Sequence, residues 1–166
     1  AVDLEGTYQS ILDIGKLTGT LDKAQEIVDD MKQKVSEIEE KVKDAPTPST
    51  YFVVSYGEWG NYTAGSGTFI DELISIAGGR NIAGNLEEPW PEFSLEKLVE
   101  EDPEVVIVSE SANIEEIKSL EGYKELTAVK ENNLKLVVES LVMRPGPRLV
   151  QGLEQIAKAI HPELFE

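Results

Sequence analysis

The stretch EVVIVS, residues 104–109, decides the fold of this 166-residue chain. Its four central residues are valine or isoleucine, with no polar residue between them. A β-branched run of this kind is typical of a strand that is covered on both faces. Two further runs have the same character, YFVVSY at residues 51–56 and LKLVVES at residues 134–140. The sequence therefore predicts three strands of a buried sheet.

Helical patterns fill the intervals between these runs. The apolar positions of residues 69–77 recur with helical spacing, and Ser94 has the N-cap position of a helix that Pro103 stops. The last helix opens at Pro147 and closes before Pro162. Because strands and helices alternate along the chain, we expect an α/β fold, with a parallel sheet and helices on both of its sides.

The first part of the chain is helical only. A short helical face stops near Gly15, and apolar residues then step by three and four through residues 20–43, with Thr20 in the N-cap position. This second pattern predicts one helix of about 24 residues, roughly 36 Å long. Two prolines in APTPST, residues 45–50, mark a boundary. We therefore expect a helical segment, residues 1–45, and an α/β domain, residues 51–166.

The composition excludes several classes of protein. With 32 acidic and 15 basic residues, the net charge of -17 repels phosphate backbones, so nucleic acid is not an expected partner. The absence of cysteine excludes disulfides and thiolate chemistry. No run approaches the ~20 apolar residues of a membrane span, and the first residues do not resemble a secretion signal. We expect either a cytoplasmic chain or the mature part of an exported protein.

The sequence offers little for catalysis. GSGTF, residues 65–69, follows a strand and opens a helix, but it matches no nucleotide-binding fingerprint, so we interpret it as a helix entry with exposed backbone amides. The single histidine, His161, is expected at a helix-ending position on the surface. Neither a catalytic triad nor metal-ligand spacing is present, so we predict no enzyme, no metal site and no cofactor.

A ligand site is predicted at one edge of the sheet. In open parallel sheets the ligand lies at the carboxyl ends of the strands, because the loops converge there. The loops after the three predicted strands carry the polar residues Glu58, Glu110 and Ser111. The side chains that we expect to bind ligand are Trp59, Asn61, Tyr62, Trp90, Met143 and Arg144.

These side chains suit a large, flat or amphipathic ligand. Aromatic faces bury apolar area, and Arg144 can pair with a carboxylate or a phosphate. For each of the two tryptophans, a packing role within the protein is as compatible with the sequence as a ligand contact. Arg148 falls in the first turn of the last helix, so we assign it a structural role and keep Arg144 as the ligand candidate.

Short motifs give the chain a resemblance to a known family. They are GGRN at residues 78–81, WP at Trp90 and Pro91, SLE at residues 94–96 and RPGPR at residues 144–148. Over about residues 6–161, the chain resembles the second lobe of the periplasmic binding proteins that deliver vitamin B12, ferric siderophores or haem to ABC importers. The resemblance implies a three-layer, Rossmann-like lobe that binds its ligand and performs no bond chemistry.

The resemblance also assigns roles along the chain. In the family one long helix joins two lobes that clamp the ligand; residues 20–43 match this connector, and residues 4–19 match the last helix of the first lobe. The rest of that lobe has no counterpart here, so we expect a C-terminal lobe, a fragment of a larger protein. Trp90 matches a tryptophan that lies against the corrin ligand, and Glu96 matches a glutamate that pairs with permease arginines. From composition alone, Glu96 is a first-turn residue that favours the helix dipole.

We therefore expect a substrate-binding component of an ABC importer, with cobalamin as the first ligand and a ferric siderophore or haem as the alternative. Its partners would be the permease subunits and a metal chelate. The resemblance places the exported parent, with or without a lipid anchor, at the periplasmic or extracellular face of the membrane. The rival interpretation is a helical interaction or dimerisation module, because the apolar stripe of residues 21–42 also suits a short coiled coil.

Overall fold

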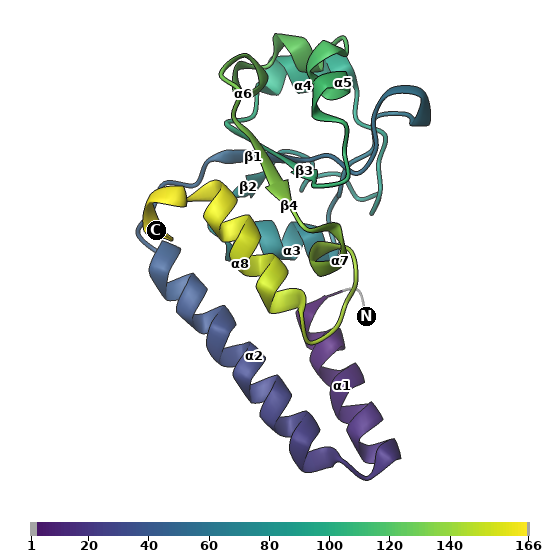
Figure 1. Ribbon diagram of the computed structural model, residues 1–166, viewed down its shortest axis with the longest axis vertical. Coiled ribbons are helices and arrows are strands. Elements are labelled where there is room, and N and C mark those ends of the chain that lie inside the picture. Colours follow the sequence, from purple (N-terminus) through teal and green to yellow (C-terminus); the bar gives the residue numbers. More distant parts are fainter. Residues whose placement is uncertain (1–2, 166) are drawn as a thin grey trace.

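The computed structural model describes residues 3–165 and contains a four-stranded, fully parallel sheet (Figure 1). The strands follow the order β2-β1-β3-β4 across the sheet. They are β1 (Ser49–Phe52), β2 (Arg80–Asn81), β3 (Val105–Ser109) and β4 (Leu134–Val137). The predicted α/β fold is confirmed. The outer bounds of the two expected parts, residues 1 and 166, lie outside the described residues.

The strand predicted at residues 51–56 is displaced in the structure. β1 starts two residues earlier and ends at Phe52. Beyond it, the backbone amides of Val54 and Ser55 donate to the carbonyl oxygen of Tyr62, at 3.0 and 3.3 Å. The second half of the apolar run therefore pairs with its own returning loop instead of extending the sheet.

The edge strand β2 was not predicted. It has only two residues and no apolar run, so the pattern that reveals a buried strand is absent. Backbone pairing with β1 defines it: the Arg80 amide donates to the Pro48 carbonyl at 2.9 Å, and the Ile82 amide donates to the Thr50 carbonyl at 3.0 Å. β2 thus forms one edge of the sheet and β4 the other.

Helices cover both faces of the sheet, as Figure 1 shows. Those on one side are α4 (Leu95–Glu101), α5 (Ile114–Ser119) and α6 (Thr127–Lys130). Those on the other side are α3 (Phe69–Ile76), α7 (Glu139–Val142) and α8 (Leu149–Ile160). Short 3-10 turns are η1 (Gly57–Trp59), η2 (Tyr123–Glu125) and η3 (Pro162–Leu164). The three-layer arrangement agrees with the prediction.

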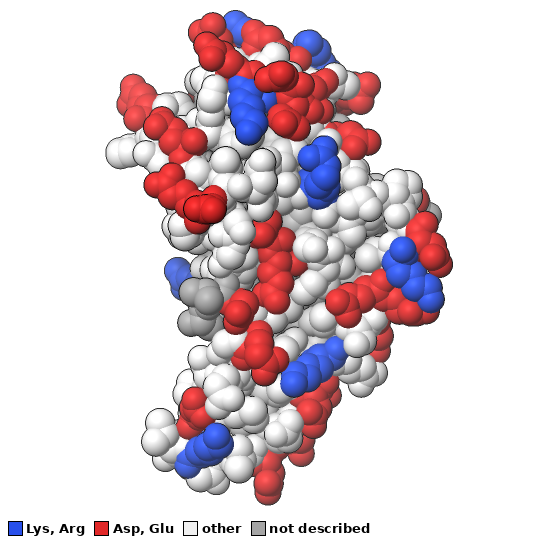
Figure 2. Space-filling model, turned by 180° about the vertical axis from the view of Figure 1, so that it is seen from behind, with Lys and Arg blue, Asp and Glu red and all other residues white. Residues whose placement is uncertain are grey.

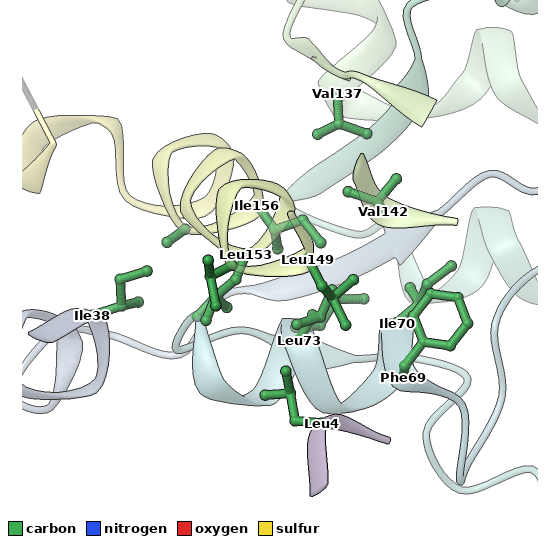
Figure 3. Packing of buried hydrophobic residues seen from close by; sticks show 14 of the residues in the cluster. Leu4, Ile38, Phe69, Ile70, Leu73, Val137, Val142, Leu149, Leu153 and Ile156 are labelled. Atoms are coloured by element: carbon green, nitrogen blue, oxygen red, sulfur yellow. The ribbon is translucent and has the colours of Figure 1, made fainter. Parts of the chain in front are cut away.

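Two hydrophobic clusters lie on the two faces of the sheet, because successive strand residues point to opposite sides. Phe52 and Ile107 belong to the cluster that α3 and α8 cover, whereas Tyr51 and Val106 belong to the cluster on the other face. Figure 3 shows the first cluster, in which residues of α8 such as Leu153 lie over residues of α3. Each fully buried side chain of this size contributes about 1.5–3 kcal/mol by leaving water.

The first two helices, α1 (Leu4–Thr18) and α2 (Leu21–Val42), form an antiparallel pair that extends away from the sheet (Figure 1). Gly19 ends α1 in the left-handed conformation, with φ of 70°. The pair closes tightly because Gly15 faces Ala24: a Cβ atom added to Gly15 would stand 2.5 Å from the Ala24 Cβ. The predicted long helix is confirmed, with 22 residues.

The apolar stripe of α2 is buried within the chain. Val28, Met31 and Ile38 are buried, and α2 contacts α1, α3 and α8. The coiled-coil interpretation needs the same stripe to be available to a second helix. The stripe already packs on the α/β body and on α1. It is therefore not available to a second helix, and the structure argues against the dimerisation module.

His161 was predicted at a helix end on the surface, and the second half of that prediction is wrong. The residue is the C-cap of α8, but it is buried, with 2% of its surface exposed. Its Nε2 atom lies 3.3 Å from the carbonyl oxygen of Gly78, and its Nδ1 atom lies 3.4 Å from Glu163. Gly78 adopts φ of 79°, and a Cβ atom there would meet the imidazole Nε2 at 2.9 Å, so the glycine turn makes room for the ring.

Candidate functional site

A hollow of about 190 Å³ lies where β1, β3 and α7 meet at the carboxyl edge of the sheet. Apolar residues that continue β1 form part of its wall, and polar residues that follow β3 and β4 form another part. Its lining includes Val54, Tyr56, Ser109, Ser111, Glu139 and Met143. The edge that the topology rule selected from sequence therefore carries a hollow.

Trp59 is held outward by the loop that follows β1. It closes η1 between Gly57 and Gly60, which adopt φ of 65° and 80°. Only glycine takes such angles without strain, so the loop turns back within four residues. The Ser55 hydroxyl donates to the Gly60 carbonyl at 3.0 Å and fixes the return. As a result the Trp59 side chain is 83% exposed.

Trp90 lies on a second loop that is joined to the first. Tyr62 forms isolated antiparallel bridges with Ser55 and with Glu92, so the two loops are fastened together. The Trp90 ring meets the Phe69 ring edge-on, with ring centroids 6.4 Å apart, and 40% of the residue stays exposed. The packing interpretation of this tryptophan is thus observed in part, since one side of the ring packs on α3, and a ligand contact through the exposed part stays a prediction.

Met143 and Arg144 follow α7. Met143 lines the hollow and is half-buried, whereas Arg144 is exposed. Arg148 is the N-cap residue of α8, and its carbonyl accepts from the amide of Gln151 at 2.9 Å. Arg148 therefore lies one residue before the first turn in which it was expected, without a side-chain cap bond, and Arg144 is an exposed residue next in sequence to the hollow-lining Met143.

Asn61, which the sequence predicts as a ligand residue, forms hydrogen bonds within the protein, and its contact with a ligand stays a prediction. The side chain is buried: its Nδ2 atom donates to the Phe93 carbonyl at 2.7 Å, and its Oδ1 atom accepts the hydroxyl of Tyr123. Burial raises the pKa of the Tyr123 hydroxyl well above its usual range. Because the amide nitrogen and the amide oxygen of the Asn61 side chain both form hydrogen bonds inside the protein, the residue holds the loop in place.

Tyr51 lies close to this interior network. Within residues 3–165 its buried hydroxyl has no hydrogen-bond partner, and burial raises its pKa. Asn61 and Tyr123 also line a second hollow, of about 580 Å³, between η1, the entry to α4 and η2. This second hollow lies on the α4 side and is lined by different residues from the first.

A polar network closes the first hollow, and sequence reasoning missed its central residue. The hydroxyls of Ser109 and Ser111 donate to the Oε2 atom of Glu139, at 3.1 and 2.9 Å. The Glu139 amide donates to a carboxylate oxygen of Glu110 at 2.6 Å. The sequence pattern places Glu139 inside the third predicted strand, residues 134–140. The observed strand ends at Val137, and that end would include Glu139 among the predicted ligand residues of the following loop.

Glu96 lies on the outer surface of the α4 side. It is exposed in the first turn of α4, whose N-cap Ser94 accepts a hydrogen bond from the Lys97 amide at 3.4 Å. The predicted cap is therefore confirmed. In the part of the chain that the structure describes, Glu96 forms no ion pair with a lysine, arginine or histidine, so its carboxylate is available to a partner.

Other site types find no support in residues 3–165. No group of three or more His, Cys, Asp or Glu side chains could hold a metal ion there. The described helices include none that is long and apolar enough to cross a membrane. GSGTF has the predicted role of a helix entry: the Thr68 side chain caps α3 by accepting from the Asp71 amide at 3.2 Å.

Two relatives resemble nearly the whole chain. An uncharacterized ABC transporter substrate-binding lipoprotein of Bacillus subtilis is 29% identical over 161 residues, which cover 96% of this chain and 51% of the relative. A cobalamin-binding protein of Halobacterium salinarum is 30% identical over 171 residues, with 97% and 45% covered. The chain thus spans about half the length of these relatives.

Solved structures of periplasmic binding proteins also resemble this chain. A possible iron-binding periplasmic solute-binding protein of Staphylococcus epidermidis has a TM-score of 0.85 and 30% identity, and the match covers 97% of this chain and 64% of that one. The periplasmic vitamin B12 binding protein of Vibrio cholerae has a TM-score of 0.84 and 22% identity, with 100% and 64% covered, and supports the fold alone. The family described as periplasmic binding protein matches residues 1–139. This chain therefore belongs to the periplasmic binding protein family.

Proposed function

We propose that this chain is the C-terminal lobe of a substrate-binding protein that delivers a metal chelate to an ABC importer. It would act by binding and release, without bond chemistry. One observation carries the proposal: Trp59 and Trp90 are exposed on loops that are fastened together beyond the carboxyl end of β1. Exposed indoles held in fixed positions can cover a broad ligand face, which fits a macrocycle or a large chelate.

The helix pair supports the assignment to one lobe of two. Its tip exposes large apolar side chains, with Ile14 61% and Leu17 88% exposed. Scattered apolar residues are normal on a surface, but these two lie on the same helix beside the turn into α2. A first lobe that packs on α1 would cover them. In that arrangement α2 is the connector, and the ligand lies between the two lobes.

Cobalamin is the first ligand that we propose, and a ferric siderophore or haem is the alternative. The Halobacterium relative is called a cobalamin-binding protein. The resemblance matches Trp90 to a tryptophan that lies against the corrin ligand, and 40% of Trp90 is exposed. Arg144, exposed beside the hollow, is the residue that would favour an anionic chelate. Tyr62 and Met143 complete the set of proposed ligand contacts.

Docking to the permease is proposed for Glu96. Its carboxylate is exposed and forms no ion pair within residues 3–165, so it can meet a basic socket. α4 lies on one face of the sheet, away from the hollow at its carboxyl edge, so docking and ligand binding would use separate surfaces (Figure 1). The lipoprotein relative supports an exported parent protein.

Equilibrium dialysis of the purified chain against cyanocobalamin, a ferric trihydroxamate and haem tests the proposal, because all three absorb visible light. We expect cobalamin to be retained at millimolar protein. Replacing both Trp59 and Trp90 by alanine should abolish the retention without unfolding the protein, as checked by circular dichroism. If no chelate is retained, or if the double variant retains as much as the original chain, the proposed function is wrong.

A further inference from the structure

The hollow at the carboxyl edge ends in groups that accept hydrogen bonds. Ser109 and Ser111 each have one hydroxyl hydrogen, and their Oγ atoms lie 2.8 Å apart. Both hydroxyls also lie within hydrogen-bond distance of the same Glu139 oxygen, at 3.1 and 2.9 Å. Both hydrogens therefore stay within the network, on a glutamate oxygen or on the other serine. What the network leaves for a ligand is the second carboxylate oxygen of Glu139 and the serine lone pairs, which are acceptors only. The Tyr56 hydroxyl, also in the lining, accepts the Asn113 amide at 2.9 Å and is the one further hydroxyl there that can donate.

The charge at this position is negative and is not neutralised by a neighbour. Within residues 3–165, neither Glu110 nor Glu139 forms an ion pair with a lysine, arginine or histidine. The two carboxylates share a network, since Glu110 accepts the Glu139 amide at 2.6 Å. The rest of the molecule adds to the field: the net charge is -17, and acidic side chains are spread over the face that Figure 2 shows.

A ligand that covers this network takes the Glu139 carboxylate out of water. Removing a carboxylate from water is unfavourable unless a hydrogen-bond donor or a positive charge replaces the water. A second anion at the same position would add Coulomb repulsion in a medium that screens less than water. The chemistry of the network therefore discriminates between ligands by charge and by the groups at their edge.

We propose that this hollow selects a chelate that is neutral or positively charged and that presents amide, hydroxyl or ammonium donors to Glu139. This inference rests on the proposed function and narrows its ligand class. A corrinoid with amide side chains fits, and so does a trihydroxamate with an ammonium tail. A porphyrin with two propionates and a tris-catecholate, both anionic at their edges, do not.

Arg144 is the basic residue beside the hollow-lining Met143 that could favour the opposite choice, whereas Arg148 is the N-cap residue of α8. It follows Met143, which lines the hollow, but it is not itself part of the lining. Glu139 lies in the lining and is fixed by two serines. The position of the two charges therefore predicts that Glu139 sets the preference and that Arg144 only reduces the penalty for an anion.

The test is a titration of the nitrogen-15-labelled chain by NMR, at up to millimolar ligand, so that weak binding by a single lobe is measured. The probes are diamagnetic: cyanocobalamin, the gallium trihydroxamate with an ammonium tail, zinc protoporphyrin and a gallium tris-catecholate. We expect the amide signals of Ser111 and Glu139 to shift with the first two probes. Their dissociation constants should be at least about tenfold lower than those of the anionic probes, the effect of one charge-assisted hydrogen bond.

The decisive variant is Glu139→Gln, which keeps the size and removes the charge. It should narrow the difference between the two ligand classes by about tenfold. Glu131→Gln is the matched control, because it changes the net charge equally but lies at the C-cap of α6, before β4 begins. Arg144→Gln should weaken the anionic probes and leave the order of the four ligands unchanged.

The outcomes separate the inference from the proposed function. Tighter binding of an anionic probe, or equal effects of Glu139→Gln and Glu131→Gln, would overturn the inference while a chelate-binding function stands. Signal shifts confined to residues outside the hollow would do the same. If none of the four probes binds, the proposed function and the inference are both wrong.

Discussion

Two of the regions in which this molecule exposes large apolar side chains differ in how they hold them. Beyond the carboxyl end of β1, Trp59 and Trp90 lie on loops that hydrogen bonds and bridges fix, and the same edge of the sheet carries a hollow with a polar network. At the tip of the helix pair, Ile14 and Leu17 lie on a regular helix. The comparison teaches that exposure marks a surface to be covered, whereas fixed aromatic rings beside polar groups mark a ligand site.

The first prediction compares the free energy of unfolding that is lost when a buried leucine and an exposed leucine are replaced by alanine. Leu153→Ala should lower the free energy of unfolding by about 2–5 kcal/mol, because Leu153 is fully buried between α8 and α3. Leu17→Ala, the same substitution at the tip, should change it by less than about 0.5 kcal/mol. Urea unfolding followed by circular dichroism measures both. Similar losses would mean that the tip is covered within the chain.

The second prediction compares how substitutions in the two exposed regions change ligand binding. Trp90→Ala should weaken ligand binding at least tenfold, ~1.4 kcal/mol, because the ring would cover the ligand face. It should also lower stability slightly, since the contact with Phe69 is lost. Leu17→Ala should leave binding unchanged. Equilibrium dialysis measures the ligand affinity of the two variants. If Trp90→Ala binds the ligand as tightly as the original chain, Trp90 is not part of the site.

The third concerns the base of the helix pair, where α1 is fastened to α3. The Leu4 amide donates to a Glu72 oxygen at 2.7 Å. Burial raises the pKa of the Glu72 carboxyl above its ordinary value of 4.5; the Leu4 amide opposes this, and Asp3 adds to it. A raised pKa means that the charged form costs stability at neutral pH. That cost disappears as pH falls through the raised pKa, and it is absent below about 4.5.

Glu72→Gln has no charge to lose, so it isolates this effect from the other carboxylates. The stability of the original chain minus that of Glu72→Gln should increase as the pH is lowered from 7 toward 4.5. Urea unfolding across this pH range measures the difference, and Glu131→Gln, at an exposed position, is the control. A difference that stays constant with pH would contradict the raised pKa.

The smallest effect on the chain itself is expected at Glu96. Glu96→Ala should change stability by less than about 0.5 kcal/mol and should leave ligand affinity unchanged, because the residue is exposed and no residue of α4 lines the first hollow. In a two-lobed parent protein the same change should reduce uptake through the importer. Transport assays with radiolabelled ligand measure it; reduced binding with normal uptake would refute the docking role.

The fold was predictable because its signals are local. The run of β3, the helix from residue 21 to residue 42, and the cap Ser94 each depend on a few neighbouring residues. β2 carried no such signal, because two residues without an apolar pattern become a strand only through pairing with β1. Backbone pairing between distant segments cannot be read from composition or period.

The sequence predicted the edge of the sheet that carries the first hollow, but not the burial of each side chain there. Asn61 is buried because the loop is closed by hydrogen bonds to Phe93 and Tyr123, residues that are distant in sequence. Glu139 was missed because the end of β4 was placed three residues too late. His161 became buried because Gly78, 83 residues away, opens space for its ring.

The placement of the tryptophans has an optical consequence. The chain contains two tryptophans, and both lie on the loops at the carboxyl edge. Its intrinsic emission therefore arises from those loops, with Trp59 already in water and Trp90 partly so. A chelate that settles there will quench the indole fluorescence of both residues, whereas unfolding will change mainly the emission of Trp90, which packs on Phe69. The protein thus carries a built-in reporter of occupancy, and its Trp59 component is largely insensitive to unfolding.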